Sequence, residues 1–131
     1  MAKKEKHKNR QTLEEILQSI SGIMFPAEPE KHIDINCHGY CGDTPLHVML
    51  WNNNNHGAEL LIEAGANVNT KGEMDETPLH VALRQKNTKL IKLLLQKGAK
   101  DNIKSEFDET PREMARFMDK DIQKLFQFKN L

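Results

Sequence analysis

The stretch Asp43-Thr44-Pro45-Leu46-His47-Val48 returns 33 residues later as Glu76-Thr77-Pro78-Leu79-His80-Val81. A degraded third copy, Glu109-Thr110-Pro111-Arg112-Glu113-Met114, follows after the same interval. Shifting residues 44–76 onto residues 77–109 aligns identical residues at 16 of 33 positions. Self-similarity at a fixed period of this length is the sequence signature of a repeat architecture. The chain therefore contains a true internal repeat.

Each Thr-Pro pair predicts the start of a helix, because the hydroxyl can cap a free N–H and Pro is tolerated in the first turn. The run of asparagines at 52–55 is expected to interrupt the first helix, since Asn prefers turns and caps. A second helix should place Ala58, Leu61 and Ile62 on one face. Gly65 is positioned to end that helix in the left-handed conformation. Each unit is therefore predicted to be helix, turn, helix and long turn.

Two short helices cannot bury their apolar faces alone, so neighbouring units should stack over one elongated core. The stretch Thr12-Leu13-Glu14-Glu15 has capping-box spacing and precedes an apolar stripe, which predicts a helix ending near Ser21-Gly22. This helix looks like the second helix of an incomplete unit. Apolar residues expected to close the other end are Phe117, Ile122, Leu125, Phe126 and Phe128. The predicted organisation is a basic disordered tail over 1–11 and a single domain over 12–131, comprising an N-terminal cap (about 12–43), repeats (about 44–76 and 77–109) and a C-terminal capping repeat (about 110–131).

With Thr-Pro-Leu-His present twice and Gly-Ala-Asn-Val-Asn once, the chain resembles an ankyrin repeat protein over about residues 32–128. The resemblance implies an all-α solenoid of stacked helix-turn-helix units with extended β-turn loops. It also implies non-enzymatic binding of another protein on a concave face formed by the turn tips and the first helices. Asp75 and Asp108 depart from the family pattern, which often has Gly there, whereas Gly42 fits it. Arg112 and Glu113 replace Leu-His in the third copy, as expected of a terminal repeat.

Mapping that concave face onto this chain gives a row of candidate binding residues, with Trp51, Arg84 and Phe117 on the first helices. Aromatic residues, Met and Arg are the types that dominate binding hot spots. The alternative is that Trp51 and Phe117 pack against neighbouring repeats. Around the row, acidic residues at the tips would form a surface stripe that steers a basic partner. The predicted partner-binding set is Tyr40, Asp43, Trp51, Glu73, Met74, Glu76, Arg84, Glu106, Phe107, Glu109 and Phe117.

The histidines and cysteines have structural and chemical interpretations. As part of the ankyrin-like Thr-Pro-Leu-His motif, His47 and His80 are expected to join one turn to the next by hydrogen bonds to the backbone. A shared metal is not expected, because residues one repeat apart are too far separated to ligate the same ion. Cys37 and Cys41, with His38 between them, form a cluster with metal-ligand chemistry. A metal-binding module there is the weaker alternative, because no second Cys pair supports it and free reduced thiols suit the positions.

Catalytic and targeting motifs are absent from the sequence. There is no Gly-x-Ser-x-Gly nucleophile turn, phosphate-cradling loop or His-Glu-x-x-His, so neither an enzyme nor a cofactor is predicted. No apolar run is longer than four residues, which excludes a membrane span. Because the basic N-terminus has no apolar stretch behind it, no export signal is predicted, and a cytoplasmic location is expected.

The balanced charge, 19 basic against 19 acidic residues, conceals an asymmetry. The first ten residues hold five Lys or Arg against one Glu, which leaves the remainder at −4. The tail is expected to be a solvating arm, with nucleic-acid contact through it as the minority interpretation. The chain should be a monomer before it binds a protein with a basic surface. Its plan is similar to that of immunity proteins that neutralise a toxin or nuclease, although a scaffold or regulatory adaptor would share these features.

Overall fold

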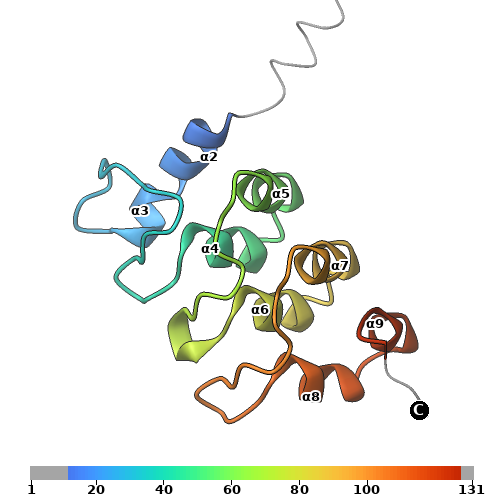
Figure 1. Cartoon of the computed structure of the whole chain (residues 1–131). Coiled ribbons are helices and arrows are strands. Elements are labelled where there is room, and N and C mark those ends of the chain that lie inside the picture. Colours follow the sequence, from blue (N-terminus) through green and yellow to red (C-terminus); the bar gives the residue numbers. More distant parts are fainter. Residues whose placement is uncertain (1–11, 128–131) are drawn as a thin grey trace, which may run out of the picture.

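Helix pairs repeat along the chain in the computed structural model, which describes residues 12–127. In each pair a first helix packs against a second helix, and equivalent helices of successive pairs lie side by side (Figure 1). No β-strand occurs among residues 12–127. The stack confirms the all-α solenoid that the 33-residue period predicts. The pairs are α4 (Pro45–Trp51) with α5 (Asn55–Glu63), α6 (Pro78–Arg84) with α7 (Thr88–Gln96), and α8 (Pro111–Arg116) with α9 (Lys120–Leu125).

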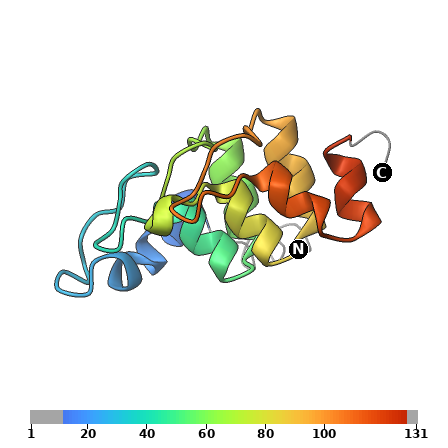
Figure 2. The same cartoon turned by 90° about the horizontal axis from the view of Figure 1, so that it is seen from below.

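Long turns join the pairs and project to one side of the stack. In Figure 1 the tips of these turns lie at the lower left. The first helices form the middle row, and the second helices form the row farthest from the tips. Figure 2 shows the turns ahead of α6 and α8 beside each other, and the former contains a short 3-10 helix, η1 (Glu73–Asp75). The tips and the first helices therefore share one face of the molecule.

Both kinds of helix begin at side-chain caps. Thr77 accepts a hydrogen bond at its hydroxyl from the His80 N–H, and His80 in turn accepts one at Nδ1 from the Thr77 N–H at 2.9 Å. The asparagine run ends α4 at Trp51, and Asn54 then caps α5 by accepting from the Gly57 N–H at 2.9 Å. This confirms the interruption that the asparagines predict. Gly65 ends the helix pair with a φ of +95°, as expected of a left-handed terminator.

The core runs along the stack between the two rows of helices. Leu79 on α6 and Leu94 on α7 are fully buried, as are Ala58 and Leu61 on the predicted face of α5. Each fully buried leucine contributes about 1.5–3 kcal/mol of hydrophobic stabilisation. Because a core of this kind is shared between units, each unit is held by its neighbours.

At the C-terminal end of the described residues, Ile122 and Phe126 are buried, as predicted. Phe117 does not help to close the stack, because 91% of its side chain is exposed. It is the C-cap residue of α8 and lies in solvent where the first helix ends. Leu125 is half-buried against the core, and Phe128 lies outside the described residues.

At the N-terminal end, α2 (Leu13–Ser19) begins with the predicted capping box at Thr12 and packs against α5. It stops before Ser21-Gly22, and a second short helix, α3 (Ser21–Met24), follows directly. The chain bends at Ile20 so that the side chains of Ile20 and Met24 can both be buried. The division into caps and repeats stays a prediction, and the tail expected over 1–11 lies outside the described residues.

Candidate functional site

We define the tip face as the three turn tips, residues 39–43, 72–76 and 105–109, together with Trp51, Arg84 and Phe117 at the ends of the first helices. Within residues 12–127, five large hydrophobic side chains are exposed, and four of them lie on this face. They are Tyr40 (71% exposed), Met74 (36%), Phe107 (59%) and Phe117 (91%). Trp51 is half-buried against the core, which agrees with the alternative in which it packs within the stack. Most of the exposed large hydrophobic side chains in this part of the chain thus belong to the tip face.

The three tips share one backbone geometry. Each is closed by a hydrogen bond from the N–H of its first residue to the carbonyl of its last residue, which directly precedes the helix cap: Gly39 N–H to Asp43 O at 2.8 Å, Gly72 N–H to Glu76 O at 2.7 Å, and Ser105 N–H to Glu109 O at 2.8 Å. The residue directly before the last one has a positive φ in every tip, at Gly42 (+99°), Asp75 (+56°) and Asp108 (+61°). Asp tolerates this left-handed conformation, so the two departures from the family glycine keep the turn. Met74 also has a positive φ of +59°, which is uncommon for a residue of its kind.

Hydrogen bonds join successive tips into one ledge. Asp43 accepts the Glu73 N–H at Oδ1 over 2.8 Å, and the Met74 carbonyl accepts the Glu106 N–H over 2.9 Å. Gly72 permits the first of these contacts, because a Cβ at this position would collide with the Asp43 carboxylate and lie 2.8 Å from His47 Nε2. The side chains on the tips are therefore presented from a connected backbone rather than from separate loops.

Glu76 corrects the prediction that all the acidic tip residues face solvent. Its side chain is only 1% exposed, and its carboxylate accepts hydrogen bonds from Arg84 Nε at 2.8 and 3.0 Å. This pairing raises the pKa of the Arg84 guanidinium. A buried carboxylate is tolerated when a cation of good geometry compensates it. Glu76 therefore holds Arg84 in place and is not available for direct contact with a partner.

The other acidic side chains keep the tips negative. Glu73, Asp75 and Glu106 are exposed. The Glu109 carboxylate lies 3.8 Å from Arg84 Nη2, and Asp108 pairs with Lys104 at 3.2 Å. Both members of the second pair are well exposed, so the attraction is weak and screened by salt.

A hollow of about 220 Å³ lies at the N-terminal end of the tip face. It brings together three of the predicted residues, Tyr40, Asp43 and Glu73, and adds Ile23, whose side chain is 55% exposed. Sequence reasoning missed Ile23 because the N-terminal helix was expected to end before it. The spacing of Ile20, Ile23 and Met24 was a signal that a helical turn continues.

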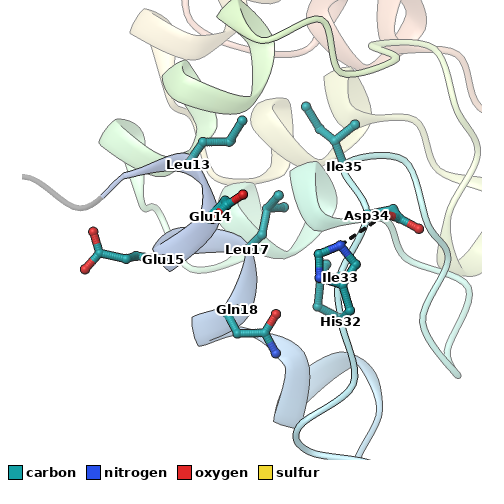
Figure 3. Close-up of a pocket in the computed structure, with 9 residues that line it drawn as sticks. All are labelled: Leu13, Glu14, Glu15, Leu17, Gln18, His32, Ile33, Asp34 and Ile35. Carbon is teal, nitrogen blue, oxygen red and sulfur yellow. Dashed lines mark ion pairs between the residues drawn. The ribbon is translucent and has the colours of Figure 1, made fainter.

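A second cavity, of about 490 Å³, lies between α2 and residues 32–35 (Figure 3). Leu13 and Leu17 of α2 line one wall, and Ile33 and Ile35 line the opposite wall. None of its lining residues belongs to the tip face. The sequence did not single out this cavity.

Two buried histidines connect the units, as predicted. His47 accepts the Thr44 N–H at Nδ1 over 3.2 Å and donates from Nε2 to the Glu76 carbonyl over 2.8 Å. His80 repeats the arrangement, donating to the Glu109 carbonyl over 2.9 Å. Burial lowers the pKa of both imidazoles. The neutral rings thus join each first helix to the tip of the next unit, which confirms their structural role.

The cysteines are free thiols in the structure, Cys37 half-buried and Cys41 exposed. Burial raises the pKa of Cys37. His38 Nδ1 lies 2.7 Å from the Gly42 carbonyl and forms a hydrogen bond with it. Across the described residues, no group of three or more His, Cys, Asp or Glu is placed to hold a metal ion. In the same part of the chain, no helix combines the length and the apolar character that crossing a bilayer requires.

The stacked helix pairs and the projecting tips define a helical solenoid of the repeat-protein class. A family model described as "Ankyrin repeats (3 copies)" matches residues 3–105. Over 50 residues the chain is 36% identical to an ankyrin repeat protein from Rickettsia felis, a segment that is 38% of this chain and 16% of that protein's length. The chain belongs to the ankyrin repeat family. Ankyrin repeats generally mediate protein–protein interaction and are typically non-enzymatic.

Proposed function

We propose that this chain binds another protein through the tip face, and that the partner presents a basic surface there. The observation that carries the proposal is the gathering of Tyr40, Met74 and Phe107 on one connected ledge, with Phe117 exposed at the end of α8. Exposed aromatic and methionine side chains supply the contact area of hot spots, and a preorganised surface loses little entropy on binding.

The charges on the tip face give the partner its chemistry. Glu73, Asp75 and Glu106 surround the apolar side chains with negative charge. A surface of this kind raises the association rate of a positively charged partner and orients it on approach. The partner is therefore expected to associate more slowly as salt is added, because exposed charges are screened.

We further propose that binding inhibits the partner, as in an immunity protein that neutralises a basic toxin or nuclease. Masking a cationic surface with a rigid acidic face would be sufficient for inhibition, so the chain needs no chemistry of its own. We place this activity in the cytoplasm and take the unbound chain to be a monomer; the free thiols of Cys37 and Cys41 suit a reducing compartment.

Two alternatives make different predictions. A scaffold or regulatory adaptor would bind through the same face but form an assembly of several proteins. A metal-binding module at Cys37, His38 and Cys41 is disfavoured, because no group of three or more His, Cys, Asp or Glu within residues 12–127 is placed to hold a metal ion. Elemental analysis of protein purified without chelator distinguishes the metal-binding module from the inhibitor and the adaptor, because only the module would contain a stoichiometric metal.

The test uses the wild-type chain and the double variant Glu73→Lys/Glu106→Lys as baits in lysate of the native host. Glu76 is left unchanged, because a lysine there would bury an unpaired charge and unfold the site. We expect the wild type to retain a basic protein that the double variant loses. A recovered nuclease that the chain inhibits would support the immunity role, whereas a multi-protein assembly would support the adaptor role.

The matched control is Glu30→Lys/Glu63→Lys, which makes the same charge change at exposed positions away from the tips. Glu63 pairs with Lys97 at 3.6 Å, but both side chains are well exposed, so little stability is lost. The control should retain the partner as the wild type does. Equal retention by the tip variant and the wild type, at low and high salt alike, would rule out the proposed face.

A further inference from the structure

We propose that the hollow beside Tyr40 receives one long cationic side chain, an arginine or a lysine, from the bound partner. The inference rests on the proposed function, since it names the partner group that enters one part of the tip face. It is carried by the hollow's combination of apolar walls with two carboxylates from different tips.

The walls of the hollow suit an aliphatic stem. Ile23 and Tyr40 form its exposed sides, and Met24 and Val48 line its inner part. Arginine and lysine bury their methylene groups along apolar surface while their charged heads stay near polar groups. A volume of about 220 Å³ accommodates one such side chain but not a helix or a strand.

Tyr40 is held in position by its backbone. Its N–H donates to the Met24 carbonyl at 2.9 Å, which ties the first tip to the end of α3. Gly39 makes this close approach possible, because a Cβ there would lie 2.8 Å from the Met24 carbonyl oxygen and 3.0 Å from Met24 Cβ. The chain therefore presents an aromatic side chain, 71% exposed, at the rim of the hollow.

The carboxylates of Asp43 and Glu73 lie along the same rim. The Asp43 carboxylate is oriented by the Glu73 N–H at 2.8 Å, so the two acidic residues are brought together from tips 30 residues apart in sequence. The neighbouring Cys41 thiol raises the pKa of the Tyr40 phenol, and the Glu73 carboxylate adds to that shift.

Together these groups recognise a cation on a flexible apolar stem. A guanidinium can lie over the Tyr40 ring and donate to a carboxylate at the same time, whereas an ammonium ion offers a compact charge without a planar face. Arginine should therefore bind more tightly than lysine. A neutral side chain of the same shape would form no ion pair with the two carboxylates and should not bind detectably.

The test titrates the 15N-labelled full-length chain, kept reduced, with Nα-acetyl-arginine methylamide while its amide NMR signals are followed. The lysine analogue and the neutral isostere Nα-acetyl-citrulline methylamide serve as the other probes. We expect saturable shifts confined to the amides of residues 39–43 and of Glu73 with arginine, smaller ones with lysine, and none with citrulline. Glu73→Gln should weaken arginine binding by about three- to fivefold, the range of a single exposed ion pair.

The matched control is Glu106→Gln, which removes the same charge from the neighbouring tip without altering the hollow. Its arginine affinity should equal that of the wild type. Absence of localised shifts, equal shifts with citrulline, or equal weakening by both variants would overturn the inference. Because no partner protein is used, such a result is distinct from failure of the bait experiment, in which the whole tip face is tested.

Discussion

His47 and His80 carry out the same task one repeat apart. Each uses Nδ1 to cap the start of its own helix and Nε2 to reach a carbonyl in the next tip. The role of Nδ1 requires a neutral ring, because a protonated Nδ1 could no longer accept a hydrogen bond. Burial lowers the pKa of each imidazole and so favours that neutral form.

A pH dependence of stability follows from these two residues. In the unfolded chain an imidazole takes up a proton below about pH 6.5, whereas the buried rings resist protonation to lower pH. The free energy of unfolding should therefore be at its full value above about pH 6.5 and fall as the pH is lowered from there towards the folded-state pKa values. Urea unfolding of the wild type at several pH values measures this decline.

His80→Gln separates the histidine contribution from that of other groups. It should lower the free energy of unfolding by about 1–3 kcal/mol at neutral pH, because the Glu109 carbonyl loses its donor. Its stability should also fall less steeply with acid than that of the wild type. His56→Gln, which changes an exposed histidine, is the control and should leave both properties unchanged. An identical slope for His80→Gln and the wild type would contradict this account.

The Arg84 and Glu76 pair predicts an asymmetry between buried and exposed charges. Arg84→Ala should lower the free energy of unfolding by about 1.5–3 kcal/mol, because it leaves a buried carboxylate without its cation. Lys104→Ala removes an exposed partner of Asp108 and should change stability by less than about 0.5 kcal/mol. Chemical unfolding of the two variants compares them, and equal losses would show that Glu76 is not held by this pair.

At the level of residues, the sequence predicted the roles that depend on local spacing. Each Thr-Pro pair could be assigned to a helix start, since a cap and a first-turn proline need only local spacing. The burial of Glu76 could not be predicted, because it depends on Arg84 folding back eight residues later across the first helix. The solvent exposure of Phe117 likewise depends on how α9 packs against α8.

The turn is the element that distinguishes this face from the rest of the stack. Repeated bonds close each tip, and Asp43 and Met74 connect one tip to the next. The sequence predicted long turns of equal length, because the period leaves about ten residues between a helix end and the next Thr-Pro. It did not predict α3 or the hollow beside it, which require the chain to bend at Ile20 and bring Met24 against Gly39.

Gly72 gives a direct test of how closely the turn packs. Gly72→Ala should lower the free energy of unfolding by about 1–3 kcal/mol, because the added Cβ would overlap the Asp43 carboxylate and press on His47 Nε2. Gly22→Ala is the matched control, since its Cβ would meet only Pro29 Cβ at 3.8 Å and the residue lies in a helix. Thermal or chemical unfolding should show a loss for the first variant and no loss for the second. Equal stability of Gly72→Ala and the wild type would mean that the tips are not joined as described.

For the whole molecule, the linear stack explains why one face can act as a unit. Each helix pair contacts its neighbours along the stack, so the spacing between equivalent tip residues follows from the packing of the pairs. Hydrophobic and acidic side chains that recur at the repeat period are therefore aligned on one surface. The period itself was readable from the sequence, which is why the alignment of equivalent tip residues could be predicted, although the burial of Glu76 could not.

Hydrogen–deuterium exchange of the chain with and without its captured partner tests the binding face most directly. The account predicts slower exchange in the bound chain at the amides of residues 39–43, 72–76 and 105–109, with the outer surfaces of α5 and α7 unchanged. Protection confined to α5 and α7, with the three tips exchanging as they do in the free chain, would contradict it.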